Sequence, residues 1–128
     1  MGKTIKEHGI SIAIKRNKKR LFIEIIMLGK LTHEDYQIFV PMVDKALKEA
    51  KEIEADLLVD MRDFKGWKLM AAWDDFKFGV KHRNAFDKMA IVGNKKWEET
   101  AAGMMSHMAR GKVKFFKERE KALSWLLK

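Results

Sequence analysis

The sequence contains no cysteine. This absence excludes disulfide bonds, thiolate zinc sites and a thiol nucleophile, and it favours a reducing compartment, so we predict a cytoplasmic protein. Long hydrophobic runs are also missing, because stretches such as residues 25–28 are far too short to span a bilayer. Lys3 and Lys6 precede no apolar stretch, so we expect no signal peptide.

The sequence is also poor in the groups that build catalytic sites. There are only three serines, and Ser106 adjoins His107 on a predicted helix, where sequence neighbours do not face each other. His33 has no second histidine at metal-binding spacing, and the glycines form no phosphate-binding pattern. We therefore predict that the protein is not an enzyme, that it uses no cofactor or metal, and that its four histidines are structural.

Basic residues outnumber acidic ones, 27 to 18, which gives a net charge of +9. The first 20 residues carry seven of these bases and one acid, a net +6 that leaves +3 for the other 108 residues. This excess indicates an acidic partner such as anionic lipid, nucleic acid or an acidic protein, or else a solubilising segment. No nucleic-acid-binding motif is present, so the charge supports only non-specific binding of nucleic acid.

Hydrophobic periodicity predicts alternating strands and helices. The expected strands cover residues 10–14, 21–28, 55–61, 89–92 and 113–116, and the expected helices cover 33–50, 68–81, 95–110 and 118–127. The order ββαβαβαβα requires crossover helices and a mostly parallel mixed sheet. The fold class is therefore α/β, with one domain over residues 1–128.

Capping and breaking residues refine these boundaries. Gly29 is expected to end the second strand, and the Thr32 hydroxyl to cap the first helix. Pro41 lies inside that helical stretch, so either the helix kinks there or a first short turn ends before it. Asn94 is expected to cap the third helix, and Gly111 to stop it.

Two apolar helical stripes predict a ligand pocket. The third helix carries a methionine-rich stripe, and methionine adapts to irregular partners. The second helix has Leu69, Trp73, Phe76 and Val80 on one face. Either stripe could instead be ordinary core. We predict a pocket between these helices, lined by Trp67, Trp73, Phe76, Trp97, Met104, Met105 and Met108.

Cations at both ends of the methionine-rich stripe are typical of an interfacial helix, and the basic N-terminal hairpin would add attraction to anionic lipid. We predict that the membrane-facing bases are Lys15, Arg16, Lys18, Lys19, Arg20, Lys95, Lys96, Arg110 and Lys112.

The chain from about Leu21 onward resembles the SpoIIAA-like (STAS-like) family of small α/β proteins. The residues that carry this resemblance are Gly29-Lys30-Leu31-Thr32, Asp35-Tyr36, Pro41, the segment 72–86, Ala90-Ile91-Val92-Gly93 and Trp97. The resemblance implies a STAS-type fold, no established catalytic residues, binding of apolar ligands and association with membranes.

Anti-sigma-factor antagonists of the wider STAS group are switched by phosphorylation of a serine in the loop after the third strand. The matching residues 60–67 contain neither serine nor threonine, so that switch is chemically excluded. The sequence thus predicts a non-enzymatic domain that binds an apolar or amphiphilic small molecule, a membrane surface, or both. The alternatives are a protein-interaction module working without phosphorylation, which could form a homodimer, and thirdly a non-specific nucleic-acid binder.

Overall fold

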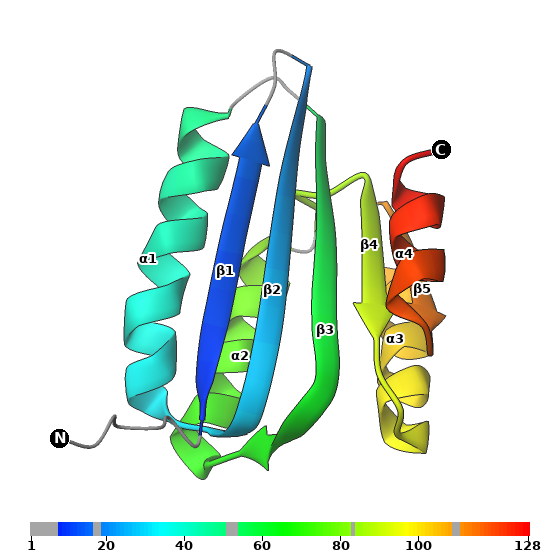
Figure 1. Ribbon diagram of the computed structural model, residues 1–128. Helices are drawn as coiled ribbons and strands as arrows, with labels where there is room; N and C mark the ends of the chain where they lie inside the picture. Colours follow the sequence, from blue (N-terminus) through cyan, green and yellow to red (C-terminus); the bar gives the residue numbers. More distant parts are fainter. Residues whose placement is uncertain (1–7, 17–18, 51–53, 83, 109–110) are drawn as a thin grey trace, which may run out of the picture.

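The computed structural model describes residues 8–16, 19–50, 54–82, 84–108 and 111–128. The five strands form one sheet in chain order (Figure 1). β1 is antiparallel to β2, and every later strand is parallel to the one before it. Their bounds are β1 Gly9–Arg16, β2 Arg20–Leu31, β3 Glu54–Trp67, β4 Lys88–Val92 and β5 Lys112–Phe116. The predicted α/β fold class is confirmed.

Three helices connect the parallel strands, and a fourth follows the last strand. They are α1 His33–Glu49, α2 Leu69–His82, α3 Lys96–Met108 and α4 Arg119–Leu126. α1, α2 and α3 cover one face of the sheet, and α4 crosses the opposite face near β4 (Figure 1). None of the helices in the described part of the chain is long and apolar enough to cross a membrane.

The hydrophobic core has two parts because alternate strand residues point to opposite faces of the sheet. The larger part lies under α1–α3 and includes the buried residues Leu21, Ile23, Ile25 and Met27 of β2. The smaller part joins β3 and β4 to α4 and consists of Leu58, Ala90, Val92, Ala122 and Leu126. The adjacent residues Phe115 and Phe116 of β5 accordingly pack against different parts.

α1 begins as predicted. The Thr32 side chain accepts a hydrogen bond from the Asp35 backbone, and the Asp35 carboxylate accepts one from the Thr32 backbone, which completes a capping box. α1 then continues through Pro41 to Glu49. A first turn that ends before Pro41 is therefore excluded.

Two predicted strand ends are wrong, because β2 and β3 extend each other by pairing. β2 passes through Gly29 to Leu31, and β3 continues beyond Met61 to Trp67. The pairing register shifts next to Gly29, whose φ is 68°, a conformation that glycine adopts readily. Residues 60–67, which the resemblance placed in a loop, thus belong to β3.

Candidate functional site

α2 packs against α1 through polar side chains. Asp74 is buried and its Oδ2 lies 2.5 Å from Nδ1 of His33. Near the other end of the two helices, Asp44 Oδ1 lies 2.6 Å from Nε2 of His82, and its second oxygen accepts a hydrogen bond from Lys81 at 3.0 Å. Partial burial raises the pKa of Asp44, but the hydrogen bonds from Lys81 and His82 outweigh this effect and hold the pKa below its ordinary value.

A chain of hydrogen bonds joins the same helices to the end of β3. The Tyr36 hydroxyl donates to Asp75 Oδ1 at 2.7 Å, and the Trp67 indole donates to the Tyr36 oxygen at 2.8 Å. Burial, followed by the nearby Asp75 charge, raises the pKa of Tyr36, so its hydroxyl stays protonated. Burial also raises the pKa of Asp75, against the opposing effect of the Tyr36 hydrogen bond.

Because the acids of α2 face α1, its apolar stripe faces solvent. Trp73 is 54% exposed, Phe76 is 58% exposed, and their rings stack with centroids 5.7 Å apart. Leu69 and Val80 are exposed as well. The prediction that Trp73 and Phe76 line an internal pocket is therefore wrong, because the partners on α1 turn this face of α2 outward.

An apolar cavity of about 140 Å³ lies between the sheet and the helices α1–α3. Its size matches that of an engineered apolar cavity known to bind benzene, roughly 150 Å³. Of the predicted lining residues, Trp67, Trp97 and Met105 do line it. Met104 does not and is 65% exposed, and the Met108 side chain lies outside the described part of the structure.

The polar part of the cavity wall was not predicted from the sequence. Asp75 of α2 and Glu98 of α3 both line the cavity, as do Phe39, Phe78 and His82. A usable signal was present for Asp75, since two adjacent acids interrupt an aromatic segment. Nothing in the sequence distinguished Glu98 from an ordinary acid in the first turn of a helix.

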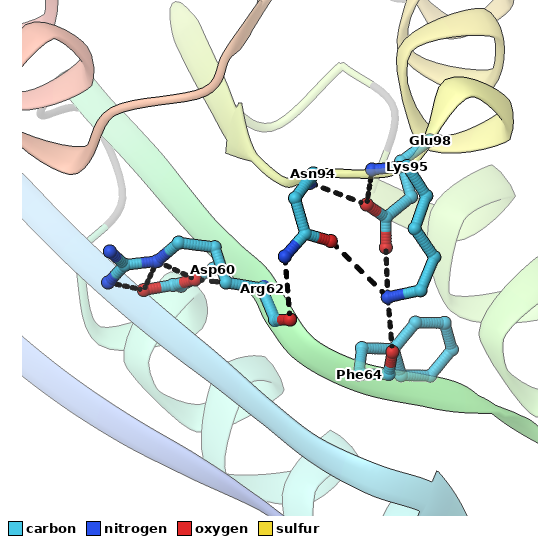
Figure 2. A network of polar contacts seen from close by, with 6 residues as sticks. All are labelled: Asp60, Arg62, Phe64, Asn94, Lys95 and Glu98. Carbon is cyan, nitrogen blue, oxygen red and sulfur yellow. Dashed lines mark hydrogen bonds and ion pairs between the residues drawn. The ribbon is translucent and has the colours of Figure 1, made fainter.

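Glu98 holds the start of α3, as Figure 2 shows. Its Oε1 accepts hydrogen bonds from the backbone N–H groups of Asn94 and Lys95, both at 3.0 Å. The prediction that the Asn94 side chain caps α3 is wrong, because its Nδ2 donates to the carbonyl of Arg62 instead. A Cβ at Gly93 would lie 2.5 Å from Glu98 Oε1, so this turn leaves no room for a side chain there.

The same network uses polar residues of β3 (Figure 2). Lys95 Nζ donates to the Phe64 carbonyl at 2.8 Å and lies 3.9 Å from Glu98 Oε2. The Arg62 guanidinium binds both oxygens of Asp60 at 2.7–3.2 Å. Burial raises the pKa of Asp60, but these bonds and the Arg62 charge outweigh it and hold the pKa below its ordinary value. The Lys95 side chain therefore joins the start of α3 to β3.

The predicted membrane-facing bases divide between opposite ends of the sheet. Lys15 and Arg16 end the antiparallel strand β1, at the same end of the sheet as the starts of β2 and β5, which hold Arg20 and Lys112. Lys19 is exposed and precedes Arg20, which binds Glu54 and Asp56. Of the predicted bases, Lys95 and Lys96 follow the carboxyl end of β4, whereas Lys18 and Arg110 lie outside the described residues.

Three of the four histidines lie against aspartates: His8 near Asp35 at 2.7 Å, in addition to His33 and His82. His107 is exposed on α3. Within the described ranges, no group of three or more histidine, aspartate or glutamate side chains could hold a metal ion.

The fold and the cavity define a class: a small α/β domain whose crossover helices line an apolar cavity against a mostly parallel sheet. The SpoIIAA-like family model matches residues 22–127. The chain therefore belongs to the SpoIIAA-like family, which confirms the resemblance.

Two solved structures are similar to this chain. An uncharacterised protein with a SpoIIAA-like fold from Shewanella loihica PV-4 is 38% identical, with 98% of this chain and 99% of that chain covered and a TM-score of 0.80. An anti-sigma factor antagonist from Mycobacterium paratuberculosis is 9% identical, with coverage of 94% and 96% and a TM-score of 0.48, a likeness too weak to carry a functional conclusion. The comparison with curated proteins finds no match.

Proposed function

We propose that this protein is a non-enzymatic, cytoplasmic binding domain for a small apolar or amphiphilic molecule. The observation that carries this proposal is the cavity of about 140 Å³ under α1–α3. Protein interiors are close-packed, and a concave apolar space with a few polar groups in its wall is the usual form of a small-molecule site. The volume suits a ligand of about the size of a single aromatic ring.

Toluene tests this proposal because it probes only the apolar volume. We expect saturable binding by isothermal titration calorimetry, and we expect Gly79→Leu to abolish it. Gly79 lines the cavity, and a Cβ added there would meet no atom within 4 Å, so the leucine side chain has space to enter.

Gly103→Leu is the matched control. Gly103 is also a helical glycine whose Cβ would meet no atom within 4 Å, but it is exposed on α3 and does not line the cavity. It should leave toluene binding unchanged. Failure of the unmodified protein to bind toluene, or equal binding by the Gly79→Leu variant, would contradict the proposal.

A second function is favoured by the outward stripe of α2, which we propose as a peripheral membrane contact. Leu69 is 88% exposed and lies one helical turn before Trp73, which stacks on Phe76, and Lys77 directly follows Phe76 in sequence. Exposed aromatic and leucine side chains beside lysines are typical of helices that lie in a membrane interface. The net charge of +9 adds attraction to anionic lipid.

Vesicle co-sedimentation tests the membrane contact. We expect binding to vesicles with anionic lipid, weakening with salt, and no binding to zwitterionic vesicles. The double variant Trp73→Ala/Phe76→Ala should lose binding, and Ile38→Ala, which removes an exposed apolar side chain of α1, should not. If the protein binds no vesicles but forms a dimer that Trp73→Ala disrupts, the stripe serves a protein interface instead.

A further inference from the structure

We infer that the cavity selects a small apolar molecule that carries a positive charge, such as a primary ammonium group on an aromatic ring. This inference rests on the proposed binding function and specifies the chemistry of its ligand. It comes from the acids in the cavity wall, which the apolar volume alone does not explain.

Glu98 is the first of these acids. It is 1% exposed and lines the cavity. While its Oε1 holds the start of α3, its Oε2 is buried and accepts no hydrogen bond from any described residue. Lys95 Nζ lies 3.9 Å from this oxygen, which is an ion-pair distance but too long for a hydrogen bond. A buried carboxylate oxygen therefore lacks a donor, and a ligand in the cavity can supply one.

Asp75 is the second acid, and it reaches the cavity from α2. Its Oδ1 accepts the hydrogen bond from Tyr36, while the Tyr36 oxygen is itself occupied by the Trp67 indole. Burial works against ionisation of Asp75, and a cation in the cavity would stabilise its charged form.

The remaining wall favours a cation as well. Although the whole chain carries 27 basic residues, no lysine or arginine lines the cavity among the residues that the structure describes. His82, the imidazole in the wall, is directed to Asp44 by its 2.6 Å contact. The indole rings of Trp67 and Trp97 line the cavity with centroids 5.7 Å apart, and aromatic rings attract cations.

Charge therefore decides between ligands of equal size. A neutral hydrocarbon leaves the Glu98 oxygen without a donor, and a carboxylate would be repelled by two acids in a medium of low dielectric constant. An ammonium group donates hydrogen bonds to a carboxylate and is attracted by the indole faces. The two acids in the wall therefore disfavour the binding of fatty acids and other apolar anions.

Four ligands of nearly the same shape test this inference by calorimetry at pH 7: benzylamine, benzyl alcohol, toluene and benzoate. We expect benzylamine to bind at least about tenfold more tightly than toluene or benzyl alcohol, as a charge-assisted hydrogen bond allows, and benzoate not to bind. Toluene binding with no preference for benzylamine would overturn the inference and leave the proposed function standing. Binding of none of the four would overturn both.

Variants locate the effect. Asp75→Asn and Glu98→Gln each keep an acceptor oxygen for the existing hydrogen bond and remove the charge, so each should lower the ratio of benzylamine affinity to toluene affinity about tenfold. Glu99→Gln, next to Glu98 but exposed, should change neither. If Asp75→Asn and Glu98→Gln bind benzylamine as tightly as Glu99→Gln does, the inference is contradicted. The ligand series on the unmodified protein tests the inference even where a variant fails to fold.

Discussion

At the scale of single residues, Asp75 works against the stability of its own fold. Its pKa is raised, mainly because burial disfavours the charged form. In the unfolded chain this aspartate ionises at its ordinary pKa of about 4, whereas in the folded protein it ionises only at a higher pH. The free energy of unfolding therefore falls as the pH rises from about 4 through the raised folded-state pKa. Acids whose pKa values are raised by burial cluster at functional sites, which agrees with the ligand-binding role proposed for Asp75.

We therefore predict that Asp75→Asn stabilises the protein at pH 7. The asparagine oxygen can still accept the Tyr36 hydrogen bond, and no charge needs to be buried. Urea denaturation should give a higher free energy of unfolding for the variant at pH 7, with a difference that shrinks towards pH 4. Asp63→Asn, at an exposed position of β3, is the control and should show no such gain; a destabilised Asp75→Asn variant would refute the prediction.

Gly111 has a role that the sequence did not predict. A Cβ there would lie 2.2 Å from the Phe86 carbonyl oxygen and 2.4 Å from that of Asp87. Its backbone passes this close because the next residue, Lys112, donates to the Asp87 carbonyl at 2.9 Å as β5 joins β4. The glycine is required by close backbone approach.

Gly111→Ala should accordingly lower the free energy of unfolding by about 1–3 kcal/mol, the usual cost of overpacking. Gly103→Ala adds the same methyl group in open space inside α3 and should raise it by roughly 0.5–1 kcal/mol, because glycine is a poor helix former. Urea denaturation of both variants measures the contrast. Equal effects of the two substitutions would show that the Gly111 backbone can move away.

At the scale of elements, α2 is oriented opposite to the sequence prediction. Its acids contact α1, and the side chains of its apolar stripe are exposed to solvent. Sequence periodicity correctly groups Leu69, Trp73, Phe76 and Val80 on one face, but it assigns that face to the interior. Large exposed aromatic side chains that pack no core need another use, which is why the stripe supports an interaction surface.

We predict that Trp73→Ala changes the free energy of unfolding by less than about 1 kcal/mol, as expected of a surface position. Phe39→Ala, which removes a buried ring of α1 in contact with Phe78, should cost about 3–5 kcal/mol. Chemical denaturation of the two variants distinguishes the faces. A cost for Trp73→Ala comparable to that of Phe39→Ala would place the stripe in the core.

At the scale of the whole molecule, two carboxylates with lowered pKa values stabilise the fold through ion pairs, one between helices and one within β3. Asp44 joins α1 to α2 through His82 and Lys81, and Asp60 binds Arg62 near the carboxyl end of β4. In both, hydrogen bonds to the charged form outweigh the effect of burial. Their stabilising contribution is complete above the ordinary aspartate pKa of about 4 and is lost as the pH falls through the lowered values.

We therefore predict that Asp44→Asn/Asp60→Asn is less stable than the unmodified protein at pH 7 and that the difference shrinks as the pH falls through the lowered pKa values of the two carboxylates. Urea denaturation between pH 2 and pH 7 measures it. An unchanged difference across this range would mean that the two carboxylates act through shape rather than charge.

The sequence alone determined the order of elements, the parallel sheet and the cap at Thr32, because these depend on local periodicity and on crossover length. It also determined that residues 60–67 hold no hydroxyl group to phosphorylate. From the cavity wall it yielded Trp67, Trp97 and Met105, the members whose apolar character shows in sequence.

Only the tertiary structure decided which side chains face the cavity and which face solvent. Asp75 turned inward because Tyr36, 39 residues away, provides its hydrogen bond, and this rotation placed Trp73 and Phe76 outside. β3 continued to Trp67 because β2 was present to pair with it. The cavity is lined by residues of three strands and three helices. Such long-range placement leaves no periodic signal in the sequence. The face that a helix buries depends on its packing partners as well as on its own hydrophobic pattern.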